Sequence, residues 1–246
     1  MHLTILTGAS RGLGHAVAEQ LLARGHTVLA LSRRPPALSV PPGAALQHWA
    51  VDLAQAAPVA ERLHAWLVAQ DSSRLSSATL INNAGVVSKL APLSGVASDD
   101  LVNALRVGLE APTLLTAAFL RATEGWTLPC KVVLVSSGLG RRAMAGSASY
   151  CVAKAGLDHL ARAVALEEAV KPHGARIVSL APGVIDTDMQ VQLRASSATL
   201  FPDRALFVTL KETGQLDSPA TAAAKLLAYL DRADFGTQPV GDVRDA

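Results

Sequence analysis

The sequence is poor in cysteine and in long apolar runs, and each shortage excludes a class of protein. Its two cysteines, Cys130 and Cys151, have neither the spacing of a metal site nor the number needed for a disulfide framework, so we interpret them as small buried hydrophobes. No apolar run reaches the roughly 18 residues that a membrane span requires. The first residues, MHLTILTGAS, also lack the pattern of a signal peptide. We therefore expect a cytoplasmic protein with no metal site and no membrane anchor.

Charge is also scarce. Charged residues make up 17% of the chain, the net charge is +2, and no basic stretch exceeds the pairs Arg33-Arg34 and Arg141-Arg142. Such a chain offers no extended positive field to a polyanion, so we expect no nucleic-acid partner.

Hydrophobic residues are abundant and periodic. They make up 50% of the 246 residues, and aromatic residues only 4%, so alanine, leucine and valine must fill most of the core. Short apolar runs alternate with longer segments of helical period, without an internal repeat or a linker. This pattern is typical of a single α/β domain over residues 1–246, with a parallel sheet covered by helices on both faces. The strands are expected at 3–7, 27–31, 46–51, 79–81, 131–135, 176–180 and 238–240, and the helices at 12–24, 57–70, 98–122, 149–170 and 218–230.

Two segments depart from the alternation. Residues 35–44 contain two proline pairs, which predict a loop because proline removes backbone donors. Residues 185–216 are polar and weakly periodic, and they follow the end of an expected strand. We interpret this second segment as a lid over a binding site.

A glycine-rich turn follows the first expected strand. Residues 7–14 read TGASRGLG, with the spacing G-x-x-x-G-x-G, and a helix starts at once. Glycines let the chain approach a pyrophosphate closely, and the helix N-terminus supplies partial positive charge. The position between strand and helix favours a dinucleotide phosphate site over a turn whose glycines only satisfy backbone geometry.

The end of the second expected strand bears on the choice of cofactor. A carboxylate there would accept the ribose hydroxyls of NAD, but the sequence has Ser32, Arg33 and Arg34 instead. A serine hydroxyl and a guanidinium can both donate to a 2′-phosphate, and Arg11 can add a second positive group from the glycine turn. The pattern favours NADP(H), with a solvated arginine pair as the alternative.

Tyr150 and Lys154 lie four residues apart in an expected helix, which places them on one face about 5–6 Å apart. A neighbouring ammonium favours the phenolate, so we expect Lys154 to lower the pKa of Tyr150 from its usual value near 10. Such a phenol could exchange protons with a substrate. Taken alone, such a pair is more often part of an amphipathic helix surface.

A pair of serines gives the tyrosine a context. Ser136 and Ser137 end the apolar run VVLV, and the carboxyl ends of strands face the ligand crevice in a doubly wound sheet. A serine there can bind a substrate carbonyl as its oxygen becomes negative, although Ser136 could instead satisfy backbone groups. An acyl-transfer serine is not expected, because no G-x-S-x-G elbow surrounds either residue and the histidines are scattered.

Taken in order, these segments resemble the short-chain dehydrogenase/reductase family over essentially the whole chain. The matching pieces are residues 7–14, Val51-Asp52-Leu53, Asn82-Asn83-Ala84-Gly85, the set Ser137, Tyr150 and Lys154, and residues 181–187, which read APGVIDT. More narrowly, IDTDM at 185–189 and the ending VGDVRD resemble the sepiapterin reductase and benzil reductase branch. The resemblance implies an extended Rossmann sheet of seven strands and hydride transfer between a nicotinamide and a carbonyl or alcohol.

The resemblance also implies residue roles. Tyr150 would be the general acid in reduction, Lys154 would lower the pKa of the tyrosine and hold the nicotinamide ribose, and Ser137 would orient the carbonyl. Asp52 would meet the adenine edge or, alternatively, cap a loop, and Thr187 would close on the nicotinamide or cap a lid helix. The expected cofactor-binding residues are Gly8, Ser10, Arg11, Gly12, Leu13, Gly14, Ser32, Arg33, Asp52, Leu53, Asn83, Ala84, Gly85, Tyr150, Lys154, Pro182, Gly183, Val184 and Thr187.

One position departs from the family. Members usually carry an asparagine on the helix after the Asn-Asn-Ala-Gly motif, where it shapes a kink and a proton relay, and the alignment puts Gly108 there. Asn103, five residues earlier, is expected to face elsewhere. Either a main-chain carbonyl holds the relay water, since glycine favours local unwinding, or the relay is weakened and turnover is slow.

The resulting hypothesis is an NADPH-dependent reductase of a ketone or dicarbonyl. The substrate pocket would be built by residues 138–148 and the lid, whose Met189, Leu193, Leu200 and Phe201 indicate a hydrophobic substrate or merely pack the lid. The alternative function is an NADP(H)-binding sensor with weak or no catalysis. The family further implies a homodimer or homotetramer that pairs through the helices near 98–122 and 149–170.

Overall fold

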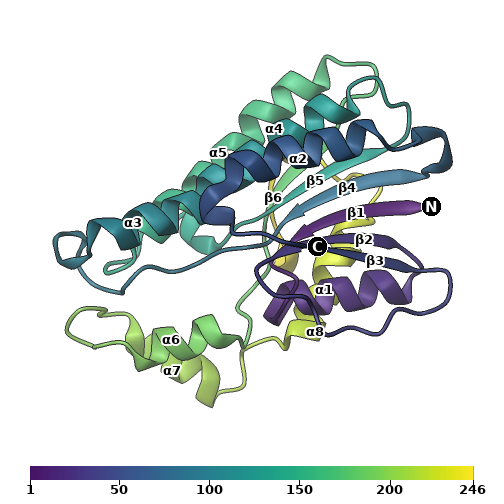
Figure 1. The fold of residues 1–246 in the computed structure, drawn as a ribbon. Helices are drawn as coiled ribbons and strands as arrows, with labels where there is room; N and C mark the ends of the chain where they lie inside the picture. Colours follow the sequence, from purple (N-terminus) through teal and green to yellow (C-terminus); the bar gives the residue numbers. More distant parts are fainter. Residues whose placement is uncertain (246) are drawn as a thin grey trace.

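A parallel sheet of seven strands runs through the protein in a computed structural model, which describes residues 1–245 (Figure 1). The inner strands carry nearly unbroken apolar runs, which are stable only when both faces of the sheet are covered. The strand order is β3-β2-β1-β4-β5-β6-β7, so the chain reverses its direction of winding between β1 and β4. The strands are β1 (His2–Thr7), β2 (Thr27–Ser32), β3 (Ala45–Ala50), β4 (Ser77–Asn82), β5 (Cys130–Val135), β6 (Arg176–Ala181) and β7 (Val240–Asp242).

Helices cover both faces of this sheet, which confirms the doubly wound α/β architecture. Helices α1 (Gly12–Ala23) and α8 (Pro219–Leu230) lie on one face and pack against each other (Figure 1). On the other face lie α2 (Ala56–Val68), α4 (Ala111–Thr123) and α5 (Ala148–Ala169). Each face therefore has its own hydrophobic core.

The long helix expected over residues 98–122 is interrupted. It divides into α3 (Ser98–Leu105), a π-helical turn over Arg106–Glu110, and α4. Such turns mark places where the regular hydrogen-bond ladder is broken. Gly108 lies at the centre of the turn, where the sequence alignment places the family's kink.

The segment 185–216, which looked weakly periodic, contains α6 (Asp188–Ala195) and α7 (Arg204–Glu212). Both helices lie beyond the carboxyl ends of the strands, at the same end of the molecule as α3 (Figure 1). The stretch 35–44 contains neither helix nor strand, as expected from its prolines.

The last strand was expected two residues too early, because β7 runs over Val240–Asp242 rather than 238–240. Pro239 has no N–H and only accepts a bond, from the backbone nitrogen of Ser179 at 2.8 Å, so regular pairing begins after it. The cysteine interpretation also holds only in part: Cys130 is buried, whereas Cys151 is half-buried.

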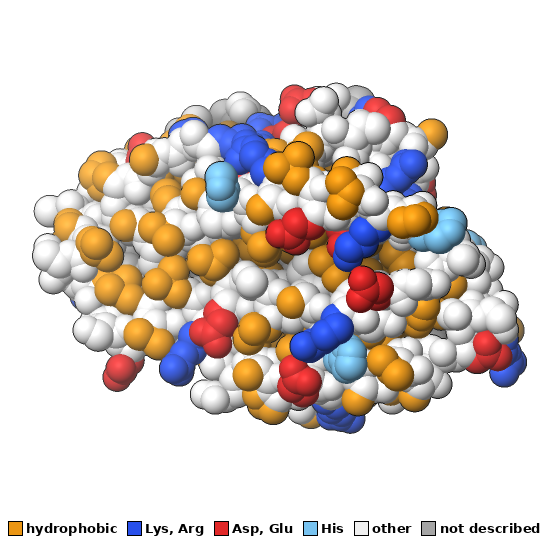
Figure 2. Space-filling view, turned by 90° about the horizontal axis from the view of Figure 1, so that it is seen from above, with side chains coloured by type: hydrophobic (Ala, Val, Ile, Leu, Met, Phe, Trp, Pro, Cys, Tyr) orange, Lys and Arg blue, Asp and Glu red, His pale blue; other side chains and the backbone are white. Residues whose placement is uncertain are grey.

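The outer surface carries several exposed apolar side chains. Figure 2 shows hydrophobic groups over much of the face seen from above, and Val152, Leu166 and Val170, in or at the end of α5, are 55%, 75% and 86% exposed. Within residues 1–245, no helix is both long enough and apolar enough to cross a bilayer.

Phe119 of α4 is fully buried in the core beneath α2, α4 and α5. We expect Phe119→Ala to lower the free energy of unfolding by about 3–5 kcal/mol, because it leaves a cavity that the sheet cannot fill. Urea denaturation measures the loss. Leu166→Ala, at an exposed position of α5, should change stability by less than about 0.5 kcal/mol, and equal losses in both variants would contradict this assignment of the core.

Candidate active site

A cleft of about 920 Å³ lies at the carboxyl ends of the strands. Its position is set by topology, since the chain winds away on opposite sides of β1 and β4 and leaves a crevice at that switch point. Every expected catalytic and cofactor-binding residue lines this cleft, from Gly8 in the first loop to Thr187 before α6. The lining also includes residues from 138–148 and from α6 and α7.

The glycine turn between β1 and α1 adopts a backbone that requires glycine. Gly8 and Gly12 have φ values of +73° and +57°, in the left-handed region. A Cβ atom on Gly14 would overlap the carbonyl oxygen of Gly8, so the first turn of α1 packs directly on the loop. This close packing brings the N-terminus of α1 into the cleft, where its free N–H groups can bind an anion.

The end of β2 presents one arginine to the cleft, and its serine bonds to the backbone. Arg33 lines the cleft, and Arg34 does not. The Ser32 hydroxyl lines the cleft and donates to the Arg34 carbonyl at 2.7 Å, so its expected bond to a phosphate would have to replace this one and stays a prediction. Residues 32–34, at the end of β2, include no carboxylate. Among them, Arg33 is the charged residue that lines the cleft.

Arg11, the second cation expected to bind phosphate, forms an ion pair with Asp188 at the start of α6. Both side chains are exposed. The pair joins the glycine turn to the segment 185–216 across the mouth of the cleft.

Asp52 and Asn83 hold the loops after β3 and β4. The Asp52 carboxylate accepts a bond from the backbone nitrogen of Ala54 at 3.0 Å, so it caps a short helix while it also lines the cleft. The Asn83 side chain donates to the carbonyl of Thr7 at 3.0 Å, and the Thr7 hydroxyl accepts from the backbone nitrogens of Asn83 and Ala84, both at 2.9 Å. The motif after β4 therefore fixes the turn after β1. Thr187 occupies the N-cap position of α6, but its side chain makes no capping bond.

Three consecutive residues at the end of β5 face three turns of α5. The Val135 carbonyl accepts from Lys154 Nζ at 2.6 Å, and the Ser136 hydroxyl donates to Asp158 Oδ1 at 2.7 Å. The Ser137 hydroxyl accepts from the backbone nitrogen of Leu139 at 3.2 Å and lies near enough to Tyr150 to affect its ionisation. Ser137, Tyr150 and Lys154 thus converge on one wall of the cleft, while Ser136 faces the protein interior.

The ionisation of this group differs from the expectation. Burial raises the pKa of Tyr150 to about 12, although the nearby Ser137 hydroxyl opposes the rise. Burial also lowers the pKa of Lys154 to about 8, which the nearby Asp158 partly counteracts. The expectation of a lowered Tyr150 pKa is therefore wrong in this structure, because burial dominates and the Lys154 amine, bonded to Val135, lies 5.4 Å from the centre of the tyrosine ring.

The π-helical turn brings Val107 into the cleft and buries Gly108 against α5. A Cβ atom at Gly108 would lie 3.1 Å from the Cβ of Ala153, so glycine permits close contact of the two helices. Asn103, expected to face elsewhere, lines the cleft. Because the helix is interrupted, these side chains point in directions that a regular helix would not predict.

The distal part of the cleft is mainly apolar. Met189 and Leu193 line it as expected, whereas Leu200 and Phe201 do not. Phe201 is buried behind the wall and stacks on Phe207 with ring centres 5.6 Å apart. These two phenylalanines form, with Leu90 and Met144, a small hydrophobic cluster separate from the two main cores.

Several lining residues were missed by sequence reasoning. Val86 and Val87 directly follow the Asn-Asn-Ala-Gly motif and could have been found by extending it. Others lack any local signal, because distant loops bring them to the cleft: Leu90, Phe207, Pro219 and Arg244.

Comparisons with known proteins agree with this geometry. The family described as short chain dehydrogenase matches residues 2–198. The chain is 34% identical to a benzil reductase ((S)-benzoin forming) of Bacillus cereus, over 99% of this chain and 98% of that protein. It is 33% identical to the sepiapterin reductase of Meriones unguiculatus over 94% and 92%, and 31% identical to an NADPH-dependent pterin aldehyde reductase of Arabidopsis thaliana over 80% of each chain.

The fold is also similar to solved structures. The crystal structure of the KRED1-Pglu enzyme superposes with a TM-score of 0.79 at 26% identity, over 97% of this chain and 99% of that one. These similarities confirm the family and the branch expected from the motifs.

The overlap at Gly14 generates a test of the glycine turn. We expect Gly14→Ala to destabilise the protein by about 1–3 kcal/mol, because its Cβ would meet backbone that cannot move without opening the turn. The melting temperature should fall by several degrees. Gly138→Ala is the matched control, since nothing lies within 4 Å of a Cβ there, and a similar fall in that variant would contradict the steric argument.

Proposed function

The chain belongs to the short-chain dehydrogenase/reductase family, and we propose that within it the chain is an NADPH-dependent carbonyl reductase with Tyr150 as general acid. The observation that carries the proposal is the convergence of Ser137, Tyr150 and Lys154 on one wall of a cleft that the glycine turn also lines.

The ionisation of these groups suits reduction. A reduced nicotinamide, when bound, supplies a hydride to the carbonyl carbon. The C=O electron pair then moves to the oxygen, and the Tyr150 hydroxyl donates its proton there. With a pKa near 12, Tyr150 holds that proton at neutral pH until the oxygen becomes more basic than a phenolate.

Ser137 and Lys154 support this transfer. The Ser137 hydroxyl, which lies near Tyr150, can donate to the same carbonyl oxygen as its charge develops. Lys154, with a pKa near 8, is mostly an ammonium at pH 7 and stabilises the tyrosinate that forms. The three side chains thus lie on one wall of the cleft, where they can act on one carbonyl oxygen.

The cofactor end of the cleft fits a phosphorylated dinucleotide. The glycine turn and the N-terminus of α1 can receive the pyrophosphate, and Asp52 and Leu53 line the adenine side. At the end of β2, the Arg33 guanidinium suits a 2′-phosphate, and no carboxylate opposes one. The relative described as NADPH-dependent supports this choice.

For the substrate, we propose a hydrophobic ketone or dicarbonyl. The apolar side chains of Val87, Leu90, Met144, Leu193 and Phe207 line the cleft, and relatives named benzil reductase and sepiapterin reductase support carbonyl reduction. We also propose that residues 185–216 act as a lid, because α6 and α7 contribute to this wall.

We further propose a homodimer or homotetramer. The exposed apolar residues of α5, such as Val152 and Leu166, lie where pairing through this helix would cover them.

Replacing the proposed acid separates chemistry from binding. We expect Tyr150→Phe to lower kcat by about 10²–10⁴-fold with an α-diketone, since the carbonyl oxygen loses its proton donor. The dissociation constant for NADPH, measured by fluorescence titration, should remain within about twofold.

The other tyrosine of the chain, Tyr229, packs in the opposite core and is the control. Tyr229→Phe should keep its turnover, and full turnover in Tyr150→Phe would refute the assignment. If the unmodified protein binds NADPH but oxidises none with α-diketones, quinones or pterins, it is the nucleotide sensor rather than a reductase.

The role of Arg33 is tested by comparing the two dinucleotides. A charge-assisted hydrogen bond contributes about 1.5–3 kcal/mol, so Arg33→Ala should weaken NADPH binding by about 10- to 100-fold. NADH binding should change little. Arg34→Ala is the matched control, because this neighbour does not line the cleft. Equal weakening for both nucleotides would show that Arg33 does not select the 2′-phosphate.

A further inference from the structure

One acidic side chain next to the active site is almost completely buried. Asp158 lies on α5, one turn after Lys154, and is 2% exposed. Its Oδ1 accepts two hydrogen bonds of 2.7 Å, from the hydroxyls of Ser136 and Ser179. Its Oδ2 has no hydrogen-bond partner and lies 3.4 Å from Nε of Arg141.

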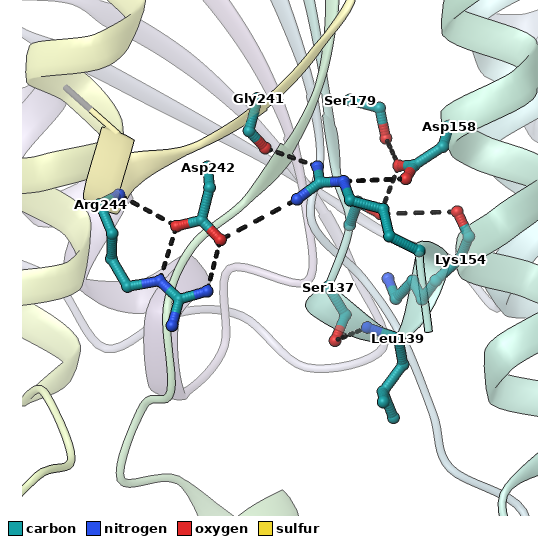
Figure 3. Close-up of polar contacts among 10 residues, drawn as sticks. Ser137, Leu139, Lys154, Asp158, Ser179, Gly241, Asp242 and Arg244 are labelled. Atoms are coloured by element: carbon teal, nitrogen blue, oxygen red, sulfur yellow. Dashed lines mark hydrogen bonds and ion pairs between the residues drawn. The ribbon is translucent and has the colours of Figure 1, made fainter. Parts of the chain in front are cut away.

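Arg141 connects this carboxylate to the C-terminal strand. Its Nη2 donates to the Gly241 carbonyl at 2.7 Å, and its Nη1 lies 3.9 Å from Asp242 Oδ2. Asp242 in turn accepts from the Arg244 guanidinium at 2.6 and 2.8 Å. The close-up in Figure 3 shows this chain of polar contacts, which runs from Arg244 to Asp158 beside Lys154.

A buried carboxylate is costly unless it is compensated, and the arrangement compensates it incompletely. Two hydroxyls and one arginine at 3.4 Å hold Asp158, while one of its oxygens lacks a hydrogen bond. Fully apolar side chains would pack this position at lower cost. The position of Asp158 suggests why a carboxylate is present here. It lies on the same helix as the buried amine of Lys154, which must stay protonated to act on Tyr150.

We propose that Asp158 is a positioning residue for carbonyl reduction: its fixed negative charge keeps Lys154 in the ammonium form, and its bond to Ser136 holds the end of β5 in place between Val135 and Ser137. This role rests on the proposed function, in which the ammonium of Lys154 stabilises the tyrosinate. Arg141 tempers the effect, because it places a positive charge on the far side of Asp158.

The charges around Lys154 predict the direction in which its pKa should change. Burial lowers the pKa of Lys154 to about 8, and Asp158 is the charge that raises it. The charged and titratable groups that surround the pair are Tyr150 on α5, Arg141 after β5, and Asp242 and Arg244 at the C-terminal end. Because the ammonium is lost as pH rises through this pKa, removing the Asp158 charge should move that loss to lower pH.

The first experiment measures the pH dependence of kcat in Asp158→Asn. Asparagine keeps the shape of the side chain and removes its charge. We expect the basic limb of the profile to move down by about one pH unit, as for the loss of a nearby opposite charge. Arg141→Gln should move the limb in the opposite direction, because it removes a positive charge and leaves Asp158 in place.

The matched control is Glu168→Gln. Glu168 is another buried carboxylate on α5, 7% exposed, but it binds Lys171 and the backbone of Ala175, far along the helix from Lys154. Its loss should reduce stability without moving the basic limb. A role of Asp158 in packing alone would affect stability in the same way and would leave the limb unmoved.

A second readout titrates Lys154 directly, without turnover. Brief acetylation by acetic anhydride at a series of pH values, followed by mass spectrometry of the peptide that contains Lys154, reports the pKa of its amine. The pKa should fall in Asp158→Asn, rise in Arg141→Gln and stay unchanged in Glu168→Gln.

The outcomes separate the two proposals. If the Lys154 amine has the same pKa in Asp158→Asn as in the unmodified protein, the proposed role of Asp158 is wrong, whatever the activity of the variant. Should Asp158→Asn fail to fold, Arg141→Gln decides, and an unchanged or lowered pKa there would overturn it. An unmodified protein that reduces no carbonyl would refute the proposed function alone, because the labelling experiment needs no substrate.

Discussion

The connection between β5 and α5 is the constraint on which the active site depends. Val135, Ser136 and Ser137 all face α5, each toward a different turn of this helix. Ser136 turns inward to the carboxylate of Asp158, and Ser137 turns to Tyr150 in the cleft. The carbonyl of Val135 then receives Lys154. A shift of α5 relative to the strand would break the bonds of Val135 and Ser136 together and would move Tyr150 away from Ser137, so the position of the tyrosine is coupled to the sheet.

Much of the fold follows from periodicity. The seven strands and the helices α1, α2, α5 and α8 lie close to their expected positions, because continuous apolar runs and helical periods are strong local signals. The π-helical turn could not be read in this way, since Val107, Gly108 and Leu109 also fit a regular helix. The start of β7 depended on Pro239 and its tertiary partner Ser179, which the local sequence does not reveal.

The sequence predicted which residues line the cleft better than it predicted their charge states and hydrogen-bond partners. Loops at the carboxyl ends of parallel strands meet by topology, so motifs far apart in sequence were bound to share a cleft. The charge states depend on burial and on exact partners, which spacing does not contain. Helical spacing brought Lys154 near Tyr150, but it could not show that burial dominates both ionisations, nor that Ser32 and Arg11 bind protein groups.

The small cluster around Phe201 and Phe207 has a consequence for the way the protein exchanges its reactants. Only four buried side chains make up this patch, whereas each face of the sheet is held by a core several times larger. Parts of a protein with few buried contacts open at lower free energy than the whole. As the proposed lid, helices α6 and α7 would therefore detach from this cluster at lower free energy than global unfolding requires, while the strands beneath stay intact.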